Sequence, residues 1–267
     1  RQRIKVMKKF FVSLVMLLSL SAASVFAQSS LIATLSHEGE ITAFYGADAL
    51  KEAHEAAAHG DVITLSSGTF NSTGIYKAIT LRGAGIQVDT KNNILPTIIS
   101  GDFIIHLSDT LTERMTIESI YNSNIITLGG TLKNARFIKC RLGELRCQNE
   151  TNGYMVNCSF IHCKVASKIR FTNNGTICSF INCYLNQPQY LSSSSGGSIN
   201  FQNCIVQSGY GGYYDRGFAF FDCYGGMFFY NSILIGNNYS TNSSVLSSSS
   251  IAYNCVAMNP LNSKDCF

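Results

Sequence analysis

The side chains that could do chemistry gather in two parts of the chain. The first is residues 133–170, where eight lysines and arginines accompany only Glu144 and Glu150. Arg141, Lys164 and Tyr184 hold the same position of a pattern that repeats through this region. Cations beside an aromatic ring suit an acidic glycan, because they pair with its anionic groups while the ring supports a sugar face. An ordinary solvated basic stripe is the alternative interpretation.

The second part is a short aromatic and charged segment made of Tyr213, Tyr214, Asp215 and Arg216. Two rings beside an acid and a base also suit sugar recognition, and loops on rigid scaffolds often carry function. Asp215 and Asp222 could form a weak version of the acid pair used in glycoside hydrolysis. The alternative is a turn rich in Gly and Tyr that packs on its neighbours.

Common catalytic motifs do not appear in the sequence. It has no Gly-x-Ser-x-Gly, His-Glu-x-x-His or P-loop motif, and its Asp residues are scattered. The ten cysteines do not follow a usual zinc spacing, so neither a metal site nor a cofactor is expected. His106 and His162 are expected to be stacked or bend residues.

The composition narrows the fold classes that remain. Charged residues make up 13% of the 267 residues, about half the typical ~25% of soluble domains, which excludes a long charged helical bundle. Hydrophobic residues make up 46%, too many for a disordered chain. Five of the 20 basic residues lie in 1–27, where there is no acid. The remainder carries 15 basic and 16 acidic residues, so no nucleic-acid partner is expected.

Residues 1–27 have the pattern of a secretory signal peptide. Met7-Lys8-Lys9 precedes an apolar run that ends in small residues before Gln28. Met7 is the expected start, which puts residues 1–6 upstream of it. No later segment is apolar for the length of a membrane span. The sequence therefore predicts an exported protein in the periplasm, at the outer surface or outside the cell.

The elements change character at Gly60. The Ala-rich residues 47–59 predict a helix, and together with a strand they form the expected N-terminal part, residues 28–60. Short alternating segments separated by turns follow, beginning with residues 61–65 and 79–81. These predict an all-β fold over residues 61–267.

A repeat of about 22 residues specifies the β architecture. Its core is an apolar residue, any residue, an Asn-like residue and then Cys or Ser. Asn tolerates the left-handed backbone of a tight bend, and the flanking Phe and Cys then point inward. The expected bend and stack residues are Asn157, Asn182, Asn203, Asn231, Asn254, Cys140, Cys163, Cys183, Cys204 and Cys255.

Most cysteines are expected to form an unpaired, buried ladder. Equivalent residues of adjacent coils have parallel Cβ vectors about 4.8 Å apart, whereas a disulfide prefers about 3.8 Å between Cβ atoms. Cys255 and Cys266 are the expected exceptions.

These features resemble a right-handed parallel β-helix of the pectin-lyase-like class. The likeness covers about residues 46–260: residues 46–83 resemble the capping helix and first coil of that class, and the Asn-Cys repeats resemble its asparagine bends and internal stacks. The class includes polysaccharide lyases, polygalacturonases and pectin methylesterases. Their acidic clusters and the Arg-containing lyase signature are not evident in this sequence.

Three functional hypotheses follow. The first is an exported bacterial β-helix protein with a binding or surface-structural role towards a polysaccharide or cell-surface glycan. The second is a polysaccharide lyase or glycoside hydrolase acting on acidic polysaccharide, with calcium as the cofactor in the lyase case. The third is a fragment of a larger adhesin.

Overall fold

The computed structural model describes residues 31–88, 91, 95–108, 113–147, 154–167, 169–171, 176–186, 188–191, 197–207, 226–235 and 251–258. These residues form an all-β structure with one short helix. No helix among them is long and apolar enough to cross a membrane.

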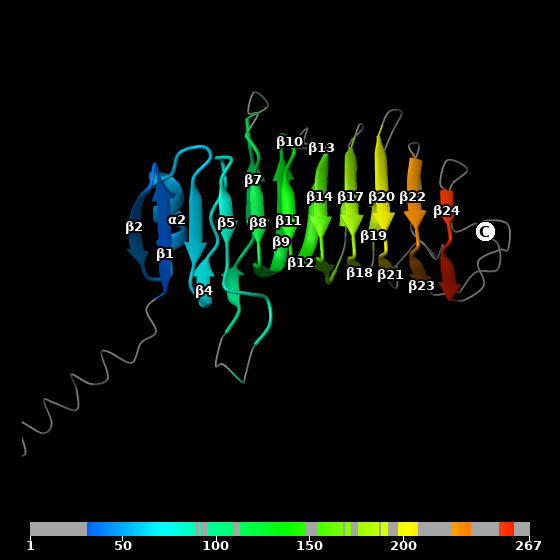
Figure 1. Ribbon diagram of the computed structural model, residues 1–267, viewed down its shortest axis with the longest axis horizontal. Coiled ribbons are helices and arrows are strands. Elements are labelled where there is room, and N and C mark those ends of the chain that lie inside the picture. Colours follow the sequence, from blue (N-terminus) through cyan, green and yellow to red (C-terminus); the bar gives the residue numbers. More distant parts are fainter. Residues whose placement is uncertain are drawn as a thin grey trace, which may run out of the picture. The chain divides into compact units, whose positions relative to one another are not determined.

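Two large sheets account for most of the strands (Figure 1). Sheet A has 11 strands, in the order β2 (Glu40–Tyr45), β1 (Ile32–His37), β3 (Val62–Leu65), β5 (Thr80–Arg82), β8 (Thr116–Glu118), β11 (Arg136–Ile138), β14 (Cys158–Ile161), β17 (Ile177–Ile181), β20 (Ser198–Gln202), β22 (Gly226–Tyr230) and β24 (Ile251–Tyr253).

Sheet B has 12 strands. Its main path is β4 (Gly68–Asn71), β6 (Thr97–Ser100), β9 (Tyr121–Gly129), β12 (Arg141–Cys147), β15 (Lys164–Val165), β18 (Tyr184–Asn186), β21 (Ile205–Gln207), β23 (Ile233–Ile235) and β25 (Val256–Met258). Three strands pair beside this path: β7 (Phe103–His106), β16 (Ile169–Phe171) and β19 (Pro188–Leu191). A separate small sheet joins β10 (Thr131–Lys133) to β13 (Tyr154–Val156).

The chain alternates between the two large sheets. From β11 onward each strand of sheet A is followed by one of sheet B, and the next passage pairs parallel with the last. We call one such passage a coil. Among the described pairings only those of β1, with β2 and β3, are antiparallel. The predicted all-β, parallel architecture is confirmed at this level.

The interior is a stack of aromatic rings. Phe137, Phe160, Phe180, Phe201 and Phe229 are fully buried and pair rung by rung in sheet A. Successive ring centroids lie 4.6, 4.7, 5.3 and 4.6 Å apart, with planes within 12° of parallel. Because each ring packs on the ring of the next coil, this ladder fixes the register of the sheet.

From β11 onward, a bend with a left-handed backbone joins each strand of sheet A to the following strand of sheet B. The φ angles at this bend run from 48° to 55° at Lys139, His162, Asn182, Asn203, Asn231 and Asn254. His162 is therefore a bend residue, as expected. Asn157 also has positive φ, but it pairs with Asn134 in a different bend that precedes sheet A. The sequence pattern had grouped it with the other asparagines because the residues around it look alike.

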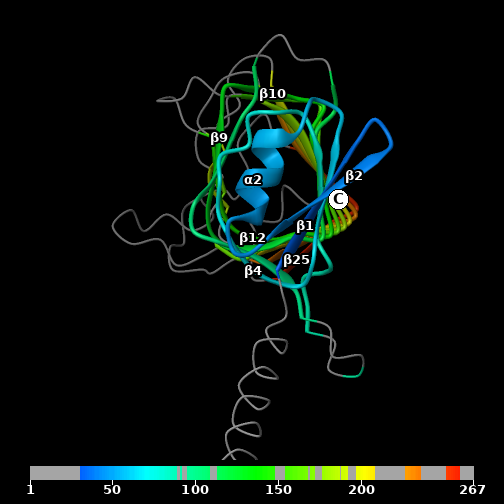
Figure 2. The same ribbon diagram turned by 90° about the vertical axis from the view of Figure 1, so that its left-hand side faces the viewer.

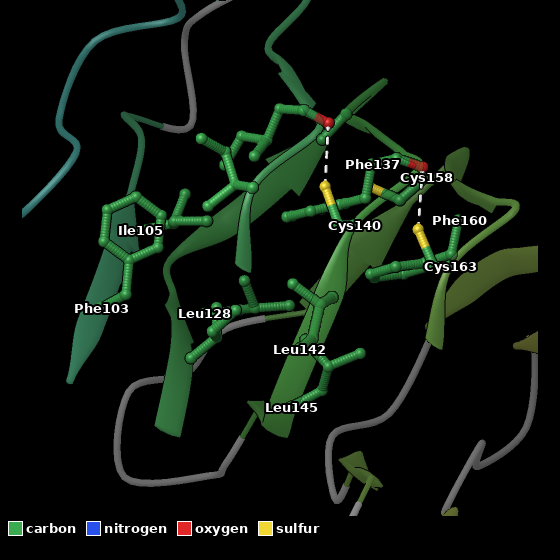
Figure 3. Packing of buried hydrophobic residues seen from close by; sticks show 14 of the residues in the cluster. Phe103, Ile105, Leu128, Phe137, Cys140, Leu142, Leu145, Cys158, Phe160 and Cys163 are labelled. Atoms are coloured by element: carbon green, nitrogen blue, oxygen red, sulfur yellow. Dashed lines mark hydrogen bonds between the residues drawn. The ribbon is translucent and has the colours of Figure 1, made fainter. Parts of the chain in front are cut away.

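The residue after each bend points inward and bonds to backbone. Cys183 Sγ lies 3.3 Å from the carbonyl oxygens of both Phe160 and Ile181, and Cys140, Cys163, Cys204 and Cys255 repeat this arrangement. Figure 3 shows Cys140 and Cys163 of this series. Ser232 takes the same place with its hydroxyl.

The ladder cysteines Cys140, Cys163, Cys183, Cys204 and Cys255 are free thiols. The expected exception at Cys255 is therefore not seen, and Cys266 lies outside the described residues. In a second buried group, burial raises the pKa of the Cys158 thiol to about 11 and that of Cys147 to about 12. These two thiols therefore stay protonated and unreactive at neutral pH.

The helix α2 (Ala49–Ala56) lies across the N-terminal end of the coils (Figure 2). Its Ala49, Leu50 and Ala53 are fully buried. An antiparallel hairpin of β1 and β2 precedes it, where the sequence predicted one strand. The hairpin and helix together cover an end that would otherwise expose apolar core.

The segment 76–78 fastens the helix to the first coil. Lys77 Nζ donates to the carbonyl oxygens of His54, Glu55 and Ala57 at 2.7–2.9 Å. The backbone N–H of Tyr76 donates to Nε2 of buried His54 at 3.2 Å. The His54 ring must therefore be neutral at Nε2 to hold this contact.

We predict that Phe180→Ala destabilises the protein by about 3–5 kcal/mol, because it removes one buried ring and leaves a cavity between two others. Ser179→Ala, at the neighbouring position on the opposite face of the strand, is the control and should change stability by less than about 0.5 kcal/mol. Urea unfolding measures both. A Phe180→Ala cost as small as the control's would contradict the stacked core.

We predict that stability falls as the pH is lowered from 6.5 to about 4. Burial lowers the pKa of His54 from 6.5 to about 4, so across this window the unfolded chain binds a proton that the folded chain excludes. The effect amounts to about 3 kcal/mol. The measurement is urea unfolding at several pH values for the native chain and for His54→Gln. An unchanged slope in His54→Gln would assign the pH dependence to other groups.

Candidate functional site

Four outward side chains line up across sheet B. The register pairs Tyr121 with Arg141, Arg141 with Lys164 and Lys164 with Tyr184. We call these four residues the basic column. The structure thus brings Arg141, Lys164 and Tyr184 together as the repeat predicts, and it adds Tyr121. Their backbone positions step along the stack by about 4.8 Å per coil.

Tyr121 was not identified from the sequence. Its coil has Ser119 at the bend and Ile120 in the place of the cysteine, so it lacks the Asn-Cys pattern. The signal that could have found it is the Ile-Tyr pair after a Thr-Ile-Glu strand, which matches the spacing but not the residue types of the later coils.

Each cation of the column lies over one of its rings. Arg141 Cζ is 4.6 Å from the Tyr121 ring centroid, and Lys164 Nζ is 5.1 Å from that of Tyr184. The Tyr184 hydroxyl donates to Gln207 Oε1 at 2.5 Å and holds its ring in place. One face of each ring is therefore covered by a cation, so the column presents positioned charge more than an open aromatic face.

The two cations of the column differ in how far solvent reaches them. Arg141 Nε is buried and, among the described residues, has no hydrogen-bond partner. Lys164 is exposed. An anion at the column could therefore approach the exposed Lys164 ammonium, whereas the buried Nε of Arg141 is closed to it.

Glu144, an acid on the same strand as Arg141, is engaged with another residue. Glu144 Oε1 accepts from Arg146 Nη2 at 2.9 Å and from Arg146 Nε at 3.1 Å. The negative charge of Glu144 and the positive charge of Arg146 cancel each other on β12, the strand that also carries Arg141. The two cations of the column itself are Arg141 and Lys164.

Gly143 allows the strand to carry this arrangement. The pairing of β12 with β9 shifts register between Leu142 and Glu144. A Cβ at Gly143 would lie 2.2 Å from the carbonyl oxygen of Ser123 and 2.4 Å from that of Asn124. Only glycine fits so close to the neighbouring backbone, so this residue sets how Arg141 and Glu144 are presented.

Several residues singled out in the sequence lie outside the described part. These are Lys168, Glu150, the aromatic segment with Tyr213, Tyr214, Asp215 and Arg216, and Asp222. In the part that is described, no group of three or more His, Cys, Asp and Glu side chains could hold a metal ion.

A second outward set was not identified from the sequence. Tyr230 and Tyr253 pair in register on sheet A and are 40% and 65% exposed. They occupy the variable position between the inward apolar residue and the bend asparagine. Their signal in the sequence is a tyrosine at this variable position in two successive repeats.

Comparisons with protein-family models, with curated proteins and with solved structures give no match to this chain.

We predict that Gly143→Ala destabilises the protein by about 1–3 kcal/mol, because the added methyl group forces two backbone segments apart. Ser159→Ala, on the outward face of sheet A, is the control. Thermal unfolding of both variants tests this. Equal melting temperatures would mean that β9 and β12 are not in close contact at this glycine.

Proposed function

We propose that this chain is an exported right-handed parallel β-helix protein of the pectin-lyase-like kind that binds acidic glycans along the basic column. The fold part of the proposal is supported by strands that alternate between two parallel sheets, by left-handed bends and by the capping helix. Export is supported by the signal-peptide pattern of residues 1–27.

The observation that carries the binding proposal is the pair of cations held over tyrosine rings on adjacent coils. An extended acidic polysaccharide repeats its charge along its length, and the column repeats its cations in the same way. Because the rings fix the cations before the ligand arrives, less side-chain freedom is lost on binding.

The chemistry of the column favours binding over bond cleavage. Its two tyrosines and two cations include no carboxylate, and the Glu144 carboxylate on the same strand is paired with Arg146. A hydrolase needs two carboxyl groups across the scissile bond. A lyase remains the rival activity, with Arg141 or Lys164 as its base, so the experiment below measures product as well as binding.

We predict that Lys164→Gln and Arg141→Gln each weaken binding of polygalacturonate about 10-fold or more, because each removes a charged hydrogen bond worth about 1.5 kcal/mol or more. Binding of the native chain should also weaken with salt, and each variant should reduce that salt dependence. Affinity electrophoresis at two ionic strengths, with and without calcium, provides the measurement.

Lys51→Gln is the matched control. Lys51 is an exposed lysine on α2, 60% accessible, so the same charge is lost far from the column. If Lys51→Gln and Lys164→Gln weaken polygalacturonate binding equally, the effect comes from the net charge of the protein and not from the column. Absence of polygalacturonate binding by the native chain would refute the proposal. Unsaturated product absorbing at 235 nm would replace it with the lyase.

A further inference from the structure

The C-terminal coils present a surface unlike the basic column. The described residues of these coils, 197–207, 226–235 and 251–258, contain no Asp, Glu, Lys or Arg. They contribute adjacent strands at one end of both large sheets, with β20, β22 and β24 in sheet A (Figure 1). The described residues of this surface can therefore contact a ligand only without ion pairs.

Two tyrosines form the aromatic part of this surface. Tyr230 and Tyr253 are exposed and paired in register on neighbouring strands. Among the described residues, neither ring stacks on another ring and neither lies under a cation. Tyr121 and Tyr184 of the basic column differ, because each has a cation over one face.

A row of side-chain amides borders the tyrosines. Asn203, Asn231 and Asn254 are exposed at successive bends. Asn254 Nδ2 donates to Asn231 Oδ1 at 2.7 Å, which aligns the two amides along the stack. Among the described residues, that bond uses one donor and one acceptor of the pair, which leaves the other amide hydrogens and lone pairs for a ligand.

Aliphatic side chains complete the surface beyond the amides. Ile205, Ile233 and Val256 pair in register on sheet B and are 37%, 36% and 60% exposed. An amide row between apolar flanks offers both hydrogen bonds and nonpolar contact.

We propose that these coils carry a second glycan site, specific for an uncharged, extended pyranose polysaccharide. The C–H groups of a flat sugar ring pack on the electron-rich faces of Tyr230 and Tyr253. Sugar hydroxyl groups bond to the amides of Asn231 and Asn254. The described residues of this site carry no charge that could pair with an anionic glycan. We therefore expect neutral glycans to bind at the tyrosines and acidic glycans to bind at the basic column.

The tyrosines of this site lie on sheet A, and the basic column lies on sheet B. The aliphatic row of the site, by contrast, continues the column on sheet B, because Tyr184 pairs in register with Ile205. Binding at the tyrosines should be insensitive to salt, whereas binding at the column should weaken with salt. Either site can therefore fail without the other.

The test is affinity electrophoresis of the complete chain in gels containing hydroxyethyl cellulose, xyloglucan or galactomannan, at low and high salt. We expect retardation by at least one of these polymers that does not change with salt. Tyr253→Thr, which keeps a strand-forming residue, should weaken that retardation at least 5-fold, and Tyr253→Phe should restore most of it. Tyr45→Thr, at a tyrosine of β2 that is 63% exposed, is the matched control and should bind as the native chain does. Lys164→Gln tests whether the neutral ligand occupies the basic column instead.

Three results would overturn the inference. The first is no retardation by any of the three neutral polymers. The second is equal retardation of Tyr253→Thr and the native chain, with circular dichroism confirming that the variant folds. The third is equal loss in Lys164→Gln, which would place the neutral ligand on the basic column. Binding of polygalacturonate is measured in parallel, so that failure of the acidic site is recorded separately.

Discussion

Contact between identical rings on successive coils is the interaction on which the other features depend. Phe137, Phe160, Phe180, Phe201 and Phe229 stack 4.6–5.3 Å apart and are fully buried. In a parallel sheet a slip of one residue would turn every ring towards water. The ladder therefore sets a single register, and the bends and buried thiols follow from it at fixed offsets along the chain.

The same register builds the outer surfaces. A residue at a given offset from the phenylalanine lies at the same place on every coil. The side chains at that offset therefore form a column along the stack of coils. One offset gives Tyr121, Arg141, Lys164 and Tyr184, and another gives Tyr230 and Tyr253. A uniform interior thus leaves the exterior free to vary from cationic to uncharged. This separation explains how a chain without a recognisable catalytic motif could hold two different ligands.

Much of the fold and part of the basic column could be predicted from the sequence, because the phenylalanine ladder requires similar residues at regular intervals along the chain. The all-β parallel architecture, the inward cysteines and the alignment of Arg141 with Lys164 follow from the repeat, and the Ala-rich composition of residues 47–59 predicts the capping helix. Features without a periodic trace could not be found. The Gly143 contact depends on a register shift between β9 and β12, and the cap bonds of Lys77 depend on where the helix ends. Tyr121 was missed because its coil replaces the motif residues while keeping the spacing.

Hydrogen–deuterium exchange of the complete chain, with and without oligogalacturonate, tests most directly whether the column on sheet B is where ligand binds. The account predicts slower exchange in residues 121–129, 141–147 and 184–186 on addition of ligand, with residues 31–71 of the N-terminal hairpin, helix and first coil unchanged. Slower exchange confined to residues 31–71, or no change in the three segments at saturating ligand, would contradict it.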